Sequence, residues 1–315
     1  MSQRVVHSHR GTNALHTLLL LACMGLLMLV VGYAFAGRGG AVVAAGFGVF
    51  ALWVSPRIAP NVIMRLYGAR PLYPGELPVI ENVMATLTRR AELSSVPRLY
   101  YVPSQVRNAF TVGDRKRAAI GITDGILRAL NLRELKGVLA HEVSHLRNDD
   151  LRVMTLADMV SRMTASLSFV GQLLLLVNLP LLVMGRVTVP WLLVILLLAA
   201  PSLATLLQLA LSRTREHDAD VGAYELTGDA RGLASALAKM ERYQRRFLDL
   251  VVPGRKVPDP SLLRTHPNAE ERIERLLRLE GAALEPVPQS VSFAVPANFP
   301  RVERGPRWHW TGLWY

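Results

Sequence analysis

The chain has 315 residues, 51% of them hydrophobic, and its mean hydropathy of +0.26 is high for a soluble enzyme. The formal net charge is +12, but no basic run carries interleaved aromatic residues, which argues against nucleic acid as a partner. A basic chain with apolar segments more often uses its charge to hold loops on the cytoplasmic side of a membrane. The single cysteine, Cys23, lies in an apolar run, which excludes a disulfide framework and a thiolate metal site.

Four uncharged stretches have the composition of membrane-spanning segments. They cover residues 18–36, 39–56, 163–185 and 187–212. A span needs about 20 helical residues, because each adds about 1.5 Å toward a hydrocarbon core of about 30 Å. The second stretch is Gly-rich and marginal in length, and prolines interrupt the last two, which membrane helices tolerate where neighbours satisfy the freed carbonyls. The sequence therefore predicts four transmembrane helices in two hairpins.

The first stretch has two alternative interpretations. It resembles a signal peptide, and its LLAC sequence, ending at Cys23, resembles a lipoprotein cleavage box. Its apolar run is longer than that of a signal peptide, however, and only about five apolar residues precede the cysteine. We therefore expect a retained anchor.

Arginines predict the orientation in the membrane. Those outside the paired stretches include Arg4, Arg10, Arg57, Arg65 and Arg70, whereas the short turns within the pairs hold only Arg38 and Arg186. Cytoplasmic loops carry the excess of positive charge. Both termini, and residues 57–162, are therefore expected in the cytoplasm.

The sequence NLRELKGVLAHEVSHLRNDD, residues 131–150, predicts a helix that carries a metal site. Asn131 and Glu134 have the spacing of a capping box, and apolar residues recur at helical spacing. His141 and His145 are four residues apart, so both imidazoles can bind one metal ion, while Glu142 can take a proton from water. This HExxH pattern is typical of zinc peptidases, although two surface histidines on an ordinary helix are the alternative.

A catalytic zinc ion needs a third protein ligand, which the extended HExxHxxGxxH pattern does not supply here, because Asn148 replaces its glycine. The sequence LSRTREHDAD, which follows the fourth stretch, places Glu216 and Asp220 on one helix face. One carboxylate can bind the metal while the other accepts a hydrogen bond from a ligating imidazole. His217 and Asp218 remain rivals for the ligand position, and a solvated charged helix end is the alternative.

Five segments in this order resemble the HtpX-like family of membrane zinc endopeptidases, relatives of the type I CAAX prenyl endopeptidase. They are RNAFTVG at 107–113, AAIGITDGILRAL at 118–130, HEVSHLRNDD at 141–150, SRTREHDAD at 212–220 and THPNAEERI at 265–273. The resemblance implies a mainly α membrane protein whose cytoplasmic α+β domain, of gluzincin type, has a small sheet beside the HExxH helix. It also implies one Zn²⁺ per chain.

The resemblance assigns roles to single residues. It implies that His141, His145 and Glu216 bind zinc, that Glu142 is the general base and that Asp220 supports the site. It also implies an activity: family members degrade damaged or misassembled membrane proteins on the cytoplasmic side of the bacterial inner membrane, often under stress. Asp149 departs from the family pattern, which usually has a small residue there, and so does His217, where an aromatic residue is usual.

The expected organisation follows from these segments. Residues 1–57 form an N-terminal hairpin, 58–162 a first peptidase part, 163–212 a second hairpin, 213–287 a second peptidase part, and 288–315 a tail rich in proline and aromatic residues. The family offers no counterpart for the tail, whose aromatic residues could lie at the membrane interface, cover the substrate groove or be disordered. The oligomeric state is not predicted.

Two further segments are candidates for substrate contact. Residues 108–111 and 118–122 are expected to form strands near the zinc, and an exposed edge at Asn108, Ala109 and Phe110 would bind a peptide as an added strand. Ordinary core strands are the alternative. The resemblance makes His266 a candidate donor to the oxyanion of the tetrahedral intermediate. The alternative is that its segment caps a helix.

Two other functions compete with broad degradation of membrane proteins. One is a dedicated processing peptidase for a single membrane or lipidated substrate, and the other is a membrane scaffold that binds clients without cutting them. An intact HExxH argues against the scaffold, which has no use for Glu142.

Overall fold

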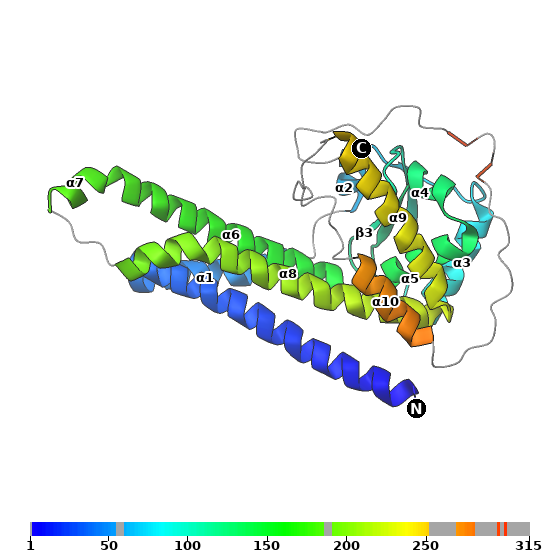
Figure 1. The fold of residues 1–315 in the computed structure, drawn as a ribbon, viewed down its shortest axis with the longest axis horizontal. Coiled ribbons are helices and arrows are strands. Elements are labelled where there is room, and N and C mark those ends of the chain that lie inside the picture. Colours follow the sequence, from blue (N-terminus) through cyan, green and yellow to red (C-terminus); the bar gives the residue numbers. More distant parts are fainter. Residues whose placement is uncertain are drawn as a thin grey trace. The chain divides into compact units, whose positions relative to one another are not determined.

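The computed structural model describes residues 2–54, 60–185, 191–251, 269–280, 295–296 and 299–300 (Figure 1). The chain forms two compact units, each built from two segments. Met1–Arg57 and Arg152–Thr214 form the first unit, and Ile58–Leu151 and Arg215–Tyr315 form the second. His266 and most of the aromatic tail lie outside the described residues.

The first unit begins with helix α1 (Ser2–Val54), which is broken at Ala36 and Gly37, where φ is −141° and +59°. The two halves run back along each other and approach closely: a Cβ added to Gly32 would lie only 2.7 Å from the carbonyl oxygen of Gly40. Glycine at both positions permits this close approach. The reversal falls where the sequence predicts a turn, next to Arg38.

Among the described residues, three helices are long and apolar enough to cross a membrane. They lie at Leu15–Ala34, in α6 (Asp150–Val177) and in α8 (Trp191–Thr227). The remaining apolar helix, Ala36–Phe50, is shorter than the about 20 residues that a span needs. The second predicted span therefore stays a prediction.

The helices of this unit also differ in extent from the predicted spans. Helix α6 begins 13 residues before the apolar stretch that starts at residue 163, because helix formation does not stop where hydrophobicity does. A short helix α7 (Leu179–Val183) follows α6.

Pro201 lies inside α8 and has no N–H group to bond the carbonyl of Leu197, four residues earlier. The side-chain amide of Gln172, on α6, donates a hydrogen bond of 2.9 Å to that oxygen. In an apolar surrounding an unsatisfied carbonyl costs several kcal/mol. Gln172 therefore satisfies the carbonyl that Pro201 leaves without a donor, and the same hydrogen bond links α6 to α8.

The second unit contains a four-stranded sheet in the order β1-β2-β4-β3. The strands are β1 (Arg70–Pro71), β2 (Arg98–Val102), β3 (Ala109–Val112) and β4 (Ala119–Thr123). Strands β2 and β4 are parallel, and the other neighbours are antiparallel. The two predicted strands are confirmed as β3 and β4, and β3 pairs with β4 alone among the described strands.

Each face of the sheet packs against different helices. Tyr101, Ile120 and Ile122 belong to the main core, together with residues of α3 (Pro78–Arg90) and α5 (Leu132–Asn148). On the opposite face, Met64 of α2 (Pro60–Leu66) packs against Tyr100. Helices α4 (Asp124–Ala129), α9 (Ala230–Val251) and α10 (Ala269–Glu280) complete the unit. Helix α9 packs against both α5 and α10, and α5 packs against β3, so α5 is held between the sheet and α9.

Candidate metal centre

Helix α5 begins at the predicted capping box. The side chain of Asn131 accepts a hydrogen bond of 2.9 Å from the Glu134 N–H, and the Glu134 carboxylate accepts one of 2.9 Å from the Asn131 N–H. Glu134 also accepts hydrogen bonds from Ser235 and Lys239 of α9. The capping box therefore fixes the start of α5, and the apolar residues at helical spacing determine the face that it buries.

His141 and His145 lie one turn apart on α5, and both are largely buried. Their Nε2 atoms are 3.1 Å apart, and their rings meet edge to face. Two imidazole nitrogens this close are spaced as two ligands of one metal ion.

Glu216 reaches the same point from α8. Its carboxylate oxygens lie 3.4 Å from Nε2 of His141 and 3.5 Å from Nε2 of His145. Helix α8 comes this close to α5 because residue 222 is glycine, where a Cβ would overlap the Ser144 hydroxyl. The three predicted ligands are thus brought together, although Glu216 comes 71 positions after His145 in the sequence.

These spacings fit a zinc site. In a tetrahedron with metal–ligand distances of about 2.0–2.1 Å, neighbouring ligand atoms are about 3.3–3.4 Å apart. The observed separations of 3.1, 3.4 and 3.5 Å lie around that value. The residues present therefore fit a zinc ion with three protein ligands, and the fourth position would be left to water or substrate.

A carboxylate lies behind each imidazole. Asp220 is 3.0 Å from Nδ1 of His141, as predicted, and Asp150 is 2.9 Å from Nδ1 of His145. Such partners orient the ring so that Nε2 can face a metal, and they increase the basicity of the ring. Burial lowers the pKa of His145, but Asp150 and Glu216 outweigh burial, so that this pKa lies well above its ordinary value. Metal binding would displace that proton.

The two rivals of Glu216 occupy other positions. Asp218 pairs with Arg215, at 3.0 Å, rather than with the histidines. His217 does not belong to the group of described residues whose ligand atoms converge. Glu216 is therefore the member of the LSRTREHDAD segment that faces both imidazoles.

Arg272 is a residue of this site that we did not predict. This arginine of α10 is buried, and it donates two hydrogen bonds to Asp220, of 2.7 and 2.8 Å. Its Nη1 also lies 3.1 Å from Glu216. One signal was available in the sequence: the other two arginines of α10 have a glutamate four residues earlier, whereas Arg272 has Asn268.

Among the described residues, the buried charges of the site balance only when the imidazoles are protonated or a cation is bound. Four buried carboxylates face two buried guanidinium groups and two imidazoles. They are Glu142, Asp150, Glu216 and Asp220, with Arg215 and Arg272. With neutral imidazoles, two negative charges remain in a site shielded from water, where unpaired charge is costly. One divalent cation neutralises them.

Glu142 lies between the histidines and the sheet. The Thr111 hydroxyl donates a hydrogen bond of 2.6 Å to its carboxylate. Thr111 belongs to β3, so the acid is held against an edge strand. Asn108, by contrast, bonds through its backbone to Thr123, and the Phe110 ring packs against Tyr67, with ring centroids 4.5 Å apart.

Such a site belongs to the class of metallopeptidases, in which a metal ion and a neighbouring carboxylate activate water beside a bound peptide. The family model for peptidase family M48 matches residues 76–280. This chain belongs to peptidase family M48.

The relatives agree with this assignment. A "Protease HtpX homolog" of Acaryochloris marina is 34% identical over 285 residues, which cover 85% of this chain and 95% of the relative. One of Pyrococcus furiosus is 32% identical over 284 residues, covering 83% and 94%. A crystal structure of S. mikatae Ste24p is 18% identical with a TM-score of 0.43, covering 85% of this chain and 66% of that chain. The two HtpX homologues confirm the resemblance to HtpX-like proteases.

Proposed function

We propose that this metalloprotease is a zinc-dependent endopeptidase that cleaves damaged or misfolded membrane proteins at the cytoplasmic face of the bacterial inner membrane. The observation that carries the proposal is the convergence of His141, His145 and Glu216, with Glu142 next to them. Zinc is favoured because two imidazoles and one carboxylate are a ligand set common in catalytic zinc sites.

When bound, zinc supplies Lewis acidity toward a carbonyl oxygen and a water molecule. Glu142 takes the proton of that water as general base and later returns it to the leaving amine. Thr111 keeps the Glu142 carboxylate aimed at the site through its hydrogen bond. Asp220 and Asp150 hold the two imidazoles in the tautomer that presents Nε2.

Strand β3 supports binding of an extended peptide. Backbone groups in an antiparallel pair point alternately toward and away from the partner strand. Asn108 bonds to β4, so the groups of Ala109 and Thr111 face the open edge. A substrate strand added there would bond to backbone atoms, which favours broad specificity. Thr111 would then contact both the substrate backbone and Glu142.

Two sequence features support membrane proteins as substrates and the cytoplasm as the site of cleavage. Glu216 follows a run of 26 uncharged residues by only four positions, which would put the scissile bond close to the bilayer surface. The arginine distribution favours cytoplasmic termini. A role in stress rests on the resemblance to the HtpX-like family.

The substitution Glu142→Gln tests the catalytic assignment. We expect the variant to retain zinc, measured by metal analysis of the purified chain, and to lose cleavage of a membrane-protein substrate. Glu225→Gln is the matched control, because Glu225 pairs with Arg147 on the same two helices but lies away from the ligands. Cleavage by a clean Glu142→Gln preparation would contradict the mechanism.

A proteome comparison tests the substrate class. Cells with the active enzyme and cells with the Glu142→Gln variant would be compared for the abundance of membrane proteins under heat stress. We expect many unrelated membrane proteins to accumulate in the variant. Accumulation of a single protein would instead identify a dedicated processing peptidase, and unchanged levels with intact client binding would identify a scaffold.

A further inference from the structure

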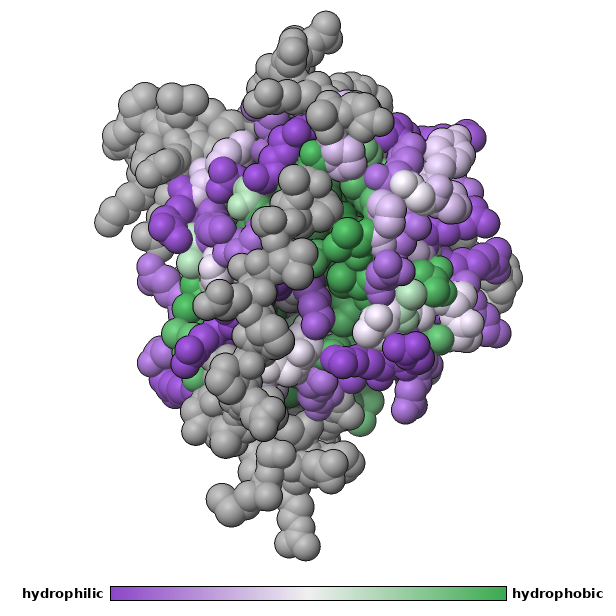
Figure 2. Space-filling model, turned by 90° about the vertical axis from the view of Figure 1, so that its right-hand side faces the viewer, coloured by the Kyte–Doolittle hydropathy of each residue, from purple (hydrophilic) through white to green (hydrophobic). Residues whose placement is uncertain are grey.

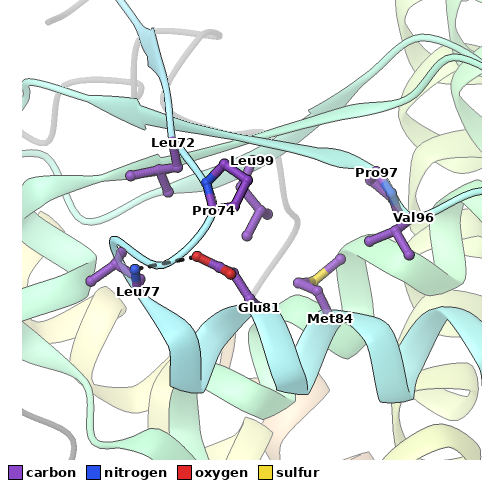
Figure 3. Close-up of a pocket in the computed structure, with 8 residues that line it drawn as sticks. All are labelled: Leu72, Pro74, Leu77, Glu81, Met84, Val96, Pro97 and Leu99. Atoms are coloured by element: carbon purple, nitrogen blue, oxygen red, sulfur yellow. Dashed lines mark hydrogen bonds between the residues drawn. The ribbon is translucent and has the colours of Figure 1, made fainter.

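An apolar groove lies in the second unit, away from the metal ligands. It is formed by the loop after β1, the first turns of α3 and the segment that enters β2 (Figure 3). The cavity has a volume of about 250 Å³ and is lined by Leu72, Pro74, Leu77, Glu81, Met84, Val96, Pro97 and Leu99. Pockets for drug-sized ligands measure about 300–1,000 Å³, so this groove suits one or two side chains.

The groove is preformed: its floor is buried, at Leu77 and Met84, and its rim is exposed. The Glu81 carboxylate accepts hydrogen bonds from the Gly75 and Leu77 N–H groups, which fixes the loop above α3. Val96 at its rim is 53% exposed. Figure 2 shows hydrophobic residues gathered in a hollow of one face of the protein, with hydrophilic residues around them.

The C-terminal part of the chain is anchored beside this groove. Phe299 is buried and meets the Tyr101 ring edge to face, with centroids 5.0 Å apart. The carbonyl oxygen of Pro300 accepts hydrogen bonds from Tyr101 (3.1 Å) and Arg128 (3.0 Å). Arg70 stacks on both rings. Phe299 and Pro300 are therefore held at a fixed point beside β1 and β2.

The groove begins close to that point. Leu99 lies two residues before Tyr101 on β2, on the same face, which is about 7 Å. Leu72 likewise lies two residues after Arg70. Residues 301–315 contain three tryptophans, and Trp308 is eight residues beyond Pro300, within a maximum reach of about 26–29 Å. Both the start and the length of this segment permit docking.

We propose that residues 301–315 dock into this groove in the same chain, with Trp308 or Trp310 filling it. An indole ring matches the apolar lining and the small volume. The charges also match, because Arg301, Arg304 and Arg307 outnumber the one acid of residues 301–310, while Glu81 gives the groove a negative charge. The proposal does not depend on peptidase activity.

Cysteine cross-linking tests the proposal in the full chain. The only native cysteine is replaced by Cys23→Ser, and Val96→Cys is combined with Arg307→Cys or with His309→Cys, which keep both indole rings. We expect an intrachain disulfide in at least one pair. Val62→Cys is the matched control, since Val62 is 56% exposed on α2, against the other face of the sheet. Failure of both pairs, cross-linking equal to the control, or a disulfide between chains would overturn the proposal.

Limited trypsin digestion is a second, independent measurement. The substitution Val96→Asp puts a charge on the groove without altering a buried residue. We expect cleavage after Arg301, Arg304 or Arg307 to become about tenfold faster, which corresponds to about 1.4 kcal/mol of docking free energy, whereas Val62→Asp leaves the rate unchanged. Equal rates in the two variants would show that the groove does not hold this segment.

Discussion

Arg272→Met tests the charge balance of the metal site. The guanidinium group lies against Asp220 and Glu216, and Arg272 is only 6% exposed. Methionine keeps much of the apolar volume but removes the positive charge. The two carboxylates would then remain buried without their partner.

The size of the effect follows from the burial. Removing one member of a buried ion pair costs about 3–5 kcal/mol, because the remaining charge is not solvated. One kcal/mol shifts the melting temperature of a domain of about 150–250 residues by about 2–4 °C. The metal-free variant should therefore melt about 6–20 °C below the parent chain. Zinc should restore part of this difference, since it supplies positive charge at the same carboxylates.

The assay is thermal unfolding of the full chain in detergent, with EDTA and with zinc. Arg275→Met is the matched control on the same helix, because its pair with Glu271 is about half exposed on both sides and such pairs contribute about 0–1 kcal/mol. Equal losses for the two variants would refute the buried position of Arg272. A larger loss with zinc than with EDTA would refute the charge argument.

Three other variants test separate parts of the structure. Glu216→Ala should strip zinc in a metal assay while Asp218→Ala should not, and the reverse result would mean that the other carboxylate is the ligand. Asp229 has a pKa below its ordinary value of 3.8, because a guanidinium and an N–H group outweigh its burial. The Asp229 carboxylate therefore stabilises the folded chain above pH 4, and this contribution is lost as the pH falls. The difference in unfolding free energy between the parent and Asp229→Asn should shrink below pH 4. A difference that stays constant with pH would contradict this. Gln172→Leu should lower stability by about 1 kcal/mol, and no change would show that the freed carbonyl of Leu197 finds another partner.

The helix of the HExxH motif was predictable because its determinants are local. Asn131 and Glu134 are three residues apart, and His141 and His145 are one turn apart, so spacing alone determines their geometry. The strands β3 and β4 were predicted for the same reason. Their neighbour β2 joins β4 through a parallel pairing that depends on tertiary contacts, which no local pattern encodes.

Asp150 and Arg272 were not predictable in this way. Asp150 is five residues after His145, a spacing that a continuous helix would not bring together on one face, and only the left-handed residue between them does so. Arg272 lies in a segment rich in charge, whose pattern is typical of a solvated helix. Its burial results from packing with partners 52 or more residues earlier in the sequence.

The junction between α5 and α6 is a single residue, Asp149, with φ of +59°. Helix α5 ends at Asn148 and α6 begins at Asp150, whose carboxylate already holds His145. One inserted residue would rotate the start of α6 by about 100° and move it by about 1.5 Å, which separates Asp150 from the imidazole. The length of this junction is therefore set by the geometry of the site, and an insertion there is expected to be more damaging than one at the exposed residues 115–117 between β3 and β4.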